Sequence, residues 1–271
     1  MKPPVLYFGA KGNLAEQIVD LMPEHVGYVE PFCGSLAVLL AKPPVKQEVV
    51  NDSDHELMNF WHQLRDNPTE LIRAAALTPH SRAEMQQAWD RGPELSDLER
   101  ARRVWITLTQ GRGASLRYRS GWRAFFDSVA TSASIGTYMD AYRNRLAPAA
   151  ERIRNVSLEC RDALEVIDDY GSAESNLLYV DPPYLYSTRS GKSSPRYADE
   201  FASDAQHREL AEHLLACNSA VMLSGYPSPL YDDLFAGWDR HDFTGRSDNA
   251  LQRDRTEVIW SNRPLGGGLL W

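Results

Sequence analysis

Leu177-Leu178-Tyr179-Val180-Asp181-Pro182-Pro183-Tyr184 is the stretch of sequence that decides the fold. Its first half is a short apolar run, which is typical of a strand buried on both faces of a parallel sheet. Asp181 then stands directly at the carboxyl end of that strand. Because open α/β sheets bind ligands at the carboxyl ends of their strands, we expect residues 181–184 to belong to a site.

Asp181 and the Pro182 carbonyl are interpreted as a rigid pair of hydrogen-bond acceptors. Each proline fixes its own φ and restricts the residue before it. An exocyclic amino group on an aromatic base is a poor nucleophile, because its lone pair is delocalised into the ring. Two acceptors that each take one N–H aim that lone pair, which is catalysis by positioning and electrostatics. Tyr184 offers a ring on which a base outside its duplex can stack.

The alternative interpretation of this motif is an ordinary turn rich in proline. In that case Asp181 caps the backbone and Tyr184 packs in the core. The position directly after a buried strand favours the site.

Short apolar runs and helical patterns alternate on both sides of this motif, which predicts an α/β fold with parallel strands and crossovers. Between them, residues 67–147 show two helical patterns and no strand-like run. We therefore expect a discontinuous domain of residues 1–62 and 150–271, with a mostly helical insertion of residues 63–149. Strands are expected near residues 26–29, 48–50, 156–158, 177–180, 220–223 and 257–260, and helices near 37–41, 54–64, 163–167 and 204–217.

The turn Glu30-Pro31-Phe32-Cys33-Gly34-Ser35 follows the first expected strand. Its small residues let a ligand approach the backbone and the next helix. Asn51-Asp52 ends the following strand, about twenty residues on, where nucleotide-binding folds place an acid that accepts from ribose hydroxyls. This pattern suits an adenosyl ligand, and a helix cap is the alternative role for Asp52.

A net charge of −8 speaks against a DNA partner, but the charges are unevenly placed. Seven arginines and no acid lie between residues 100 and 123. Four of them stand in a glycine-rich stretch with Tyr118 and Trp122, a mixture that suits contact with phosphates and base edges. Those four are Arg112, Arg117, Arg119 and Arg123. For Arg100, Arg102 and Arg103 we expect a solvated helix face instead.

Lys192 and Arg196 lie in the loop that follows residues 181–184. We assign them to the DNA backbone beside the flipped base, with a solvated loop as the alternative.

These segments resemble the DNA N6-adenine methyltransferase family, the Dam-like group of bacteria and phages with a DPPY motif. The resemblance covers most of the expected catalytic part, including an aromatic-x-Gly-x-Lys segment at residues 7–11. It implies that S-adenosylmethionine is the cofactor and that Asp162 binds the cofactor adenine. The residues it assigns to the cofactor are Tyr7, Lys11, Glu30, Pro31, Phe32, Gly34, Asp52, Asp162 and Asp181.

The resemblance further implies a Rossmann-like methyltransferase sheet with an inserted target-recognition domain. The reaction would be site-specific methylation of N6 of a flipped-out adenine in double-stranded DNA, with no metal. Its catalytic residues would be Asp181, Pro182, Pro183 and Tyr184. Residues 63–149 match the family by position alone.

Two alternatives stay open. The first is methylation of another planar nitrogen, such as an RNA adenine, cytosine N4 or a protein glutamine. The second is a DNA-binding relative that no longer catalyses. Leu36 motivates it, because the family turn often carries a glycine at that position.

Properties of the whole chain favour a cytoplasmic monomer. No apolar run approaches the roughly 20 residues that cross a bilayer, and the first residues show no secretory signal. Cys33, Cys160 and Cys217 are far apart and odd in number, which suits packing roles in a reducing compartment.

Overall fold

The computed structural model describes residues 1–124, 134–185, 203–243 and 256–266. It contains two compact units, each assembled from separate stretches of the chain. The first unit comprises residues 1–15, 34–43 and 52–160, and the second comprises residues 16–33, 44–51 and 161–271. The expected domain boundaries near residues 62 and 150 stay a prediction. No helix in the described ranges combines the length and apolar character needed to cross a membrane.

Seven strands form one mostly parallel sheet, in the order β3-β2-β1-β4-β5-β7-β6. Strand β1 pairs in parallel with β2 and β4, and β4 pairs in parallel with β5. Strand β7 runs antiparallel to both β5 and β6. The predicted α/β class is therefore confirmed. The strands are β1 (Gly27–Glu30), β2 (Gln47–Asn51), β3 (Ser157–Glu159), β4 (Asn176–Val180), β5 (Ala220–Gly225), β6 (Asp239–Phe243) and β7 (Glu257–Ser261).

Beyond β5 the sheet ends in two antiparallel strands, and β6 lies outside β7, the strand that contains Trp260. Strand β6 was not predicted. Its first four residues are exposed and only Phe243 is buried, so it has no apolar run.

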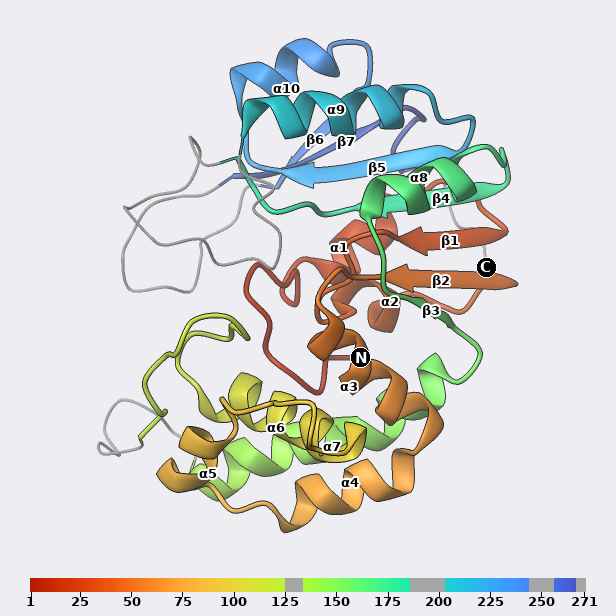
Figure 1. The fold of residues 1–271 in the computed structure, drawn as a ribbon. Coiled ribbons are helices and arrows are strands. Elements are labelled where there is room, and N and C mark those ends of the chain that lie inside the picture. The colour runs from red at the N-terminus through yellow and green to blue at the C-terminus, as the bar shows by residue number, and fades with distance from the viewer. Residues whose placement is uncertain (125–133, 186–202, 244–255, 267–271) are drawn as a thin grey trace. The chain divides into compact units, whose positions relative to one another are not determined.

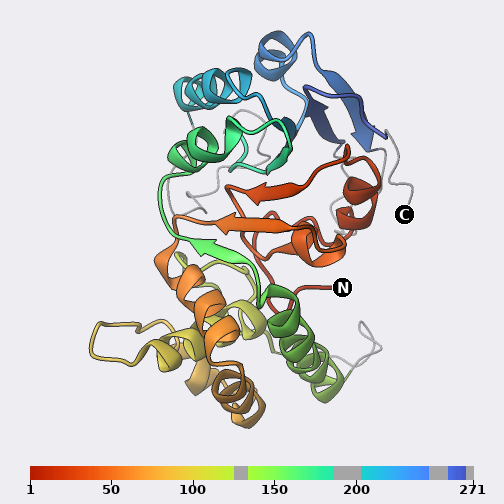
Figure 2. The same cartoon turned by 90° about the vertical axis from the view of Figure 1, so that its right-hand side faces the viewer.

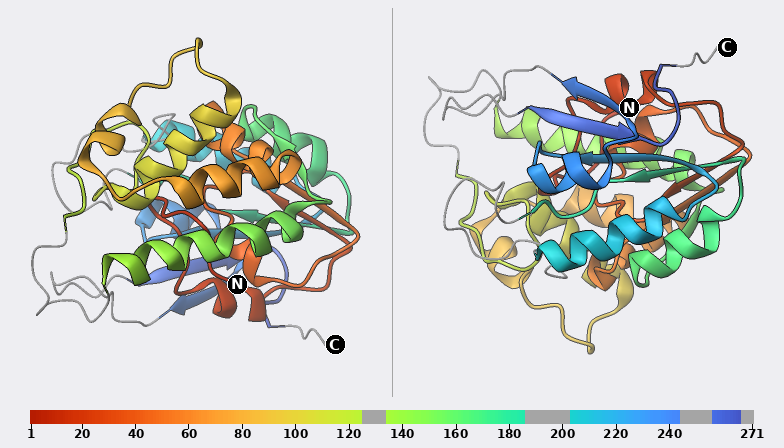
Figure 3. Two further views of the ribbon diagram at one scale, coloured as in Figure 1. Left: turned by 90° about the horizontal axis from the view of Figure 1, so that it is seen from below. Right: turned by 90° about the horizontal axis from the view of Figure 1, so that it is seen from above.

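The core of the second unit lies on one face of this sheet. Alternate side chains of the strands, such as Val29, Leu178, Val221 and Trp260, pack there against three helices. Figure 1 shows these helices, α8 (Ala163–Gly171), α9 (Asp204–Leu215) and α10 (Pro229–Leu234), over the sheet. Helices α8 and α9 lie side by side (Figure 3). Each fully buried aliphatic side chain contributes about 1.5–3 kcal/mol.

The other face of the same strands is more polar. Tyr28 pairs in register with Leu177, and neighbouring side chains on a strand point to opposite faces. Tyr28 and Glu30 therefore share a face with Leu177 and Tyr179, opposite the apolar core. This face leads to Asp181, directly after β4.

Helices dominate the first unit, where α3 and α4 pack against each other and against α6 and α7 (Figure 2). Helix α3 begins as predicted, because the Asp54 carboxylate accepts hydrogen bonds from the Glu56 and Leu57 amides at 3.0 and 3.2 Å. The helices are α3 (His55–Asp66), α4 (Pro68–Leu77), α5 (Arg82–Gln87), α6 (Asp97–Gln110) and α7 (Ile135–Ile153), with short α1 (Ala15–Asp20) and α2 (Ala37–Ala41) elsewhere in the chain.

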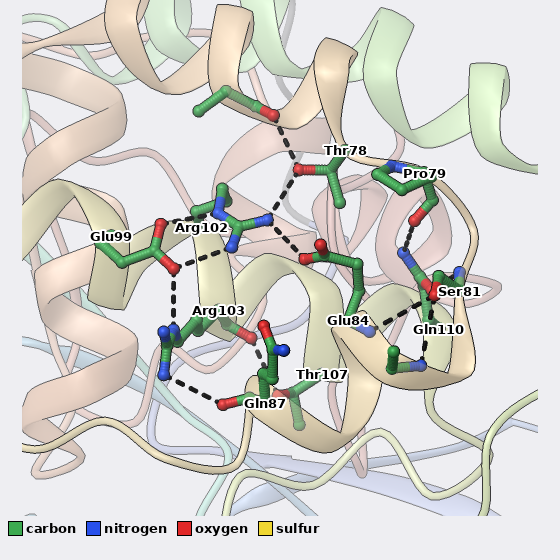
Figure 4. A network of polar contacts seen from close by, with 12 residues as sticks. Thr78, Pro79, Ser81, Glu84, Gln87, Glu99, Arg102, Arg103, Thr107 and Gln110 are labelled. Atoms are coloured by element: carbon green, nitrogen blue, oxygen red, sulfur yellow. Dashed lines mark hydrogen bonds and ion pairs between the residues drawn. The ribbon is translucent and has the colours of Figure 1, made fainter.

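Arginines of α6 form an internal network, shown in Figure 4. Arg102 donates to both Glu99 oxygens at 2.7 and 2.8 Å, and to Glu84 at 2.8 Å. Arg103 also donates to Glu99, at 2.8 Å. Arg100 pairs with Glu56 at 3.4 Å. The side chains of these arginines are only 15–23% exposed, so the expected solvated face was wrong.

Candidate active site

The DPPY motif lies at the carboxyl end of β4, as the sequence predicted. Asp181 is half-buried there, and the three residues after it are buried. The Tyr184 hydroxyl donates a 2.7 Å hydrogen bond to Oε2 of Glu257. The ring of Tyr226 packs edge-on against the ring of Tyr184, with centroids 4.4 Å apart and an interplanar angle of 63°. Sequence reasoning identified neither Glu257 nor Tyr226.

Buried tyrosines surround the Asp181 carboxylate. Burial, Asp181 and Glu257 together hold the pKa of the Tyr184 hydroxyl well above its usual value. Burial and Asp181 raise the pKa of Tyr179 in the same way. Because a neutral hydroxyl is favoured in such surroundings, both tyrosines stay protonated and remain donors at neutral pH.

Glu30 lies at the end of β1 on the polar face of the sheet. Its side chain is 2% exposed, and its Oε1 accepts a 2.6 Å hydrogen bond from the Tyr28 hydroxyl. Burial and the Glu30 carboxylate raise the pKa of Tyr28. Glu30 is thus a buried acid held in a fixed position, as a residue that orients a ligand requires.

Asn51 is a fully buried residue that joins three segments at the strand ends. Its amide nitrogen donates to the carbonyls of Pro31 at 2.9 Å and Arg161 at 3.1 Å. Its amide oxygen accepts from the Arg161 backbone N–H at 3.0 Å. Asn51 therefore fixes the turn after β1 and the segment before Asp162. Its place beside Asp52 was the only sequence signal for this role.

The first unit brings together three of the residues assigned to the cofactor. Gly34 has a φ of +48°, and a Cβ there would lie 3.0 Å from Cδ1 of Tyr7. The Gly34 amide donates to the Asp52 carboxylate at 3.1 Å, and its carbonyl accepts from the Trp61 indole at 3.0 Å. Only glycine fits this turn without displacing the Tyr7 ring.

Lys11, in the same unit, is 5% exposed, and its Nζ donates to the Gly9 carbonyl at 3.2 Å. The ammonium group is therefore held by its own loop.

Leu36 adopts the left-handed conformation, with φ 58° and ψ 29°, and its side chain is fully buried. This backbone region favours glycine and strains other residues. The strain gives a physical reason for a glycine at this position of the turn.

Asp162 is exposed and is the N-cap of α8, where its carboxylate accepts from the Leu164 amide at 2.7 Å. Pro31 is buried, and the half-buried Phe32 packs against the apolar core of the second unit. Because Asp162 is exposed, its carboxylate is accessible to a ligand.

The glycine-rich arginine stretch forms a loop closed by antiparallel contacts. The Arg112 amide donates to the Gly121 carbonyl at 2.9 Å, and the Arg123 amide donates to the Gln110 carbonyl at 2.8 Å. Arg112, Arg117 and Arg119 are exposed on this loop, and Tyr118 is 38% exposed.

Arg123 differs from the other three arginines of the loop. It is half-buried, and its guanidinium lies 5.5 Å from the centre of the Tyr138 ring. The loop is anchored nearby, because Arg91 donates to the Leu116 carbonyl at 2.8 Å. The structure therefore presents three of the four predicted arginines to solvent.

Lys192 and Arg196 lie outside the described residues. Within the described ranges, no group of three or more His, Cys, Asp and Glu residues could hold a metal ion.

Comparison with known proteins places these features in a family. The family model described as D12 class N6 adenine-specific DNA methyltransferase matches residues 7–245. The type II methyltransferase M1.LlaDCHI of Lactococcus lactis subsp. cremoris is 25% identical, over 97% of this chain and 95% of its own length.

Among solved structures, a precorrin 8W decarboxylase of Methanobacterium thermoautotrophicum gives a TM-score of 0.39 at 10% identity, over 96% of this chain and 95% of that chain. A likeness at this score carries no conclusion about fold or function.

Proposed function

Because this chain belongs to the D12 class of N6 adenine-specific DNA methyltransferases, we propose that it methylates a flipped-out adenine within a specific double-stranded DNA sequence, using S-adenosylmethionine. The observation that carries this proposal is the DPPY motif at the end of β4, where Tyr184 is fixed by Glu257 beside Asp181. Residues 1–62 and 150–271 would form the Rossmann-like catalytic domain, and residues 63–149 the target-recognition domain.

The residues present fit an adenosyl ligand in their chemistry. Asp52 stands at the end of β2 with a carboxylate that already orders the turn at Gly34. That carboxylate would accept from ribose hydroxyls, and the exposed Asp162 would accept from the adenine amino group. Tyr7, Lys11, Glu30, Pro31 and Phe32 complete the proposed cofactor set with Gly34 and Asp181. When bound, S-adenosylmethionine supplies the electrophilic methyl group.

In the proposed mechanism, the Asp181 carboxylate and the Pro182 carbonyl each accept one N–H from N6 of the substrate adenine. The nitrogen lone pair is thereby freed from the ring and aimed at the methyl carbon. The residues that would hold the cofactor would place its methyl group in line with this lone pair, and the surplus proton of N6 would pass to water after the transfer. Pro183 keeps the acceptors rigid, and Tyr184 stacks on the base.

For DNA contact we propose the exposed loop arginines, Arg112, Arg117 and Arg119. Arg123 would act with them, and Lys192 and Arg196 would hold the backbone beside the flipped base. A cytoplasmic monomer is the proposed working form.

The experiment that tests this function is sequencing of DNA incubated with the protein and S-adenosylmethionine, with detection of N6-methyladenine. We expect methylation at one short sequence, and transfer of radiolabel to DNA but not to RNA or protein. Radiolabel in RNA or protein alone would support the alternative in which the protein methylates another planar nitrogen. Calorimetry that shows DNA binding without cofactor binding would instead support a non-catalytic relative.

The salt dependence of DNA binding tests whether the arginine loop of the protein, residues 110–123, contacts DNA. Each phosphate contact contributes about one unit to the slope of log K against log salt, so Arg117→Ala and Arg119→Ala should each reduce the slope by about 1. Arg154→Ala is the matched control, because Arg154 is an exposed arginine on another segment. If the slope of log K against log salt were equal in all three variants, the loop would not contact DNA phosphates.

A further inference from the structure

We propose that Glu257 is a positioning residue for methyl transfer, which acts by holding the ring of Tyr184 in the plane that the adenine stacks on. This inference rests on the proposed role of Tyr184 as the stacking platform. Glu257 is far from the motif in sequence, 73 positions from Tyr184, and reaches it through the fold.

The sheet fixes the position of the Glu257 carboxylate. Glu257 is the first residue of β7 and pairs with Phe243 of β6, while the next residue, Val258, pairs with Gly225 of β5. Strand β7 is thus paired on both sides, and Glu257 itself pairs with β6. A carboxylate on such a rigid element is a fixed acceptor, as a positioning group needs to be.

The Tyr184 ring is held at two points. Its hydroxyl donates the 2.7 Å hydrogen bond to Glu257. Its ring packs edge-on against the Tyr226 ring, with the two ring centroids 4.4 Å apart. A tyrosine side chain has two free torsions, so a bond at the hydroxyl and a contact on the ring leave little freedom. Hydrogen bonds to a charged acceptor are also stronger than neutral ones.

The Tyr184 hydroxyl stays protonated across the neutral pH range. Burial, Asp181 and Glu257 raise its pKa well above the usual value. The hydroxyl is therefore available to donate the hydrogen bond to Glu257.

Two other roles for Glu257 predict different results. Its charge could act directly on Asp181, or it could serve only to stabilise the sheet. The variants Glu257→Ala, Glu257→Gln, Tyr184→Phe and the double variant Tyr184→Phe/Glu257→Ala separate these roles. Glutamine keeps an acceptor oxygen and removes the charge, and phenylalanine keeps the ring and removes the donor.

The measurement is the single-turnover rate of radiolabel transfer to DNA that lacks adenine methylation, with saturating DNA and full-length protein. We expect Glu257→Ala and Tyr184→Phe each to lower the rate about tenfold, the size expected for one charge-assisted hydrogen bond. The double variant should lose no more than either single variant, because both remove the same bond. Glu257→Gln should stay within about threefold of the parent rate, and the KM for DNA should change less than the rate.

Several outcomes would overturn the inference. Multiplying losses in the double variant would mean that Glu257 acts independently of the Tyr184 hydroxyl. A Glu257→Gln variant as slow as Glu257→Ala would mean that the charge matters. If Glu257→Ala does not fold, Tyr184→Phe decides alone, and a full rate would then disprove the role of the hydrogen bond.

The failure of the proposed function is distinguishable from these outcomes. If the parent protein transfers no methyl group, or if Asp181→Ala keeps the parent rate, the proposed mechanism fails. If both behave as expected and only the Glu257 series does not, the positioning role alone fails.

Discussion

Two polar clusters of this molecule are built on opposite principles. In the first unit, Glu99 of α6 accepts hydrogen bonds from Arg102 and Arg103, and its pKa falls below the usual value, chiefly because of the bonds from Arg102. At the strand ends of the second unit, Glu30 and Glu257 accept hydrogen bonds from tyrosine hydroxyls. There the pKa values of the tyrosines rise, with burial as the largest cause.

The difference indicates what each cluster is for. Opposite charges in the helical cluster lower each other's energy and join α6 to α5 through Glu84. At the strand ends, carboxylates lie among neutral hydroxyls in buried surroundings, an arrangement that costs stability and is typical of functional sites. Substitutions in the first cluster should therefore change stability more than turnover, and substitutions in the second should do the reverse.

The largest effect is expected for Asp181→Ala. Removing one preorganised group that acts on the reacting atoms lowers rates by about 100- to 1,000-fold, so methyl transfer should fall by that factor. The free energy of unfolding should change less than it does in Arg102→Ala, because Asp181 is only half-buried. Radiolabel transfer and urea unfolding measure the two quantities. A large loss of stability with little loss of rate would contradict the expectation that substitutions at the strand ends change turnover more than stability.

For Arg102→Ala we expect the opposite pattern. Its guanidinium bonds to Glu99, Glu84 and Thr78, so the variant should lose about 2–3 kcal/mol of unfolding free energy. Methyl transfer per folded molecule should change less than twofold. The control is Arg154→Ala, whose exposed pair with Glu151 should contribute within about 0.5 kcal/mol. If Arg102→Ala lost activity while keeping its full stability, the Glu99 cluster would have a role in methyl transfer.

The pH dependence of the stability of Glu99→Gln also tests whether the helical cluster stabilises the folded state. The folded-state pKa of Glu99 is depressed, so its contribution to stability is present above its unfolded pKa and is lost as pH falls through the folded value. The stability difference between parent and Glu99→Gln should therefore be full at pH 7 and shrink below about pH 4.5. Urea unfolding at pH 7, 5 and 3.5 measures it. A constant difference would mean that the pair with Arg102 does not stabilise the folded state.

The smallest effect concerns backbone strain at the cofactor turn. Leu36 has a positive φ of 58° and a fully buried side chain, so Leu36→Ala and Leu36→Gly both lose core packing. Glycine also relieves the left-handed strain, and the glycine variant should be more stable than the alanine variant by about 1 kcal/mol. The opposite order would show that the turn relaxes once the leucine is gone.

The elements that sequence reasoning identified are those with strong local signals. The apolar runs at β1, β4 and β5 depend on neighbouring residues, and all three predicted strands were confirmed. The exposed strand β6 carries no such signal, because it is defined by its pairing with β7. The left-handed backbone at Leu36 was not predicted, although the glycine that the family turn often carries at this position is the residue that such a backbone favours.

For the candidate site, the motif was predictable and its supports were not. Residues 181–184 are contiguous, whereas Glu257 meets Tyr184 only because β7 pairs beside β5. The pair of Arg102 with Glu84 was missed for the same reason, because Glu84 is 18 positions away on another helix. Pairing across such distances depends on the register of elements, which local patterns do not specify.

The contact between Asn51 and Arg161 has a consequence for the order in which the protein forms. The two residues are 110 positions apart in the chain, yet two hydrogen bonds join them, and a third joins Asn51 to the Pro31 carbonyl. During synthesis, the buried amide of Asn51 cannot reach its partner until all of the intervening residues have left the ribosome. Closing so long a loop is entropically costly, and the cost falls when the intervening segment is already compact. The helical region can therefore act as a folding spacer, whose early collapse hastens assembly of the strand ends.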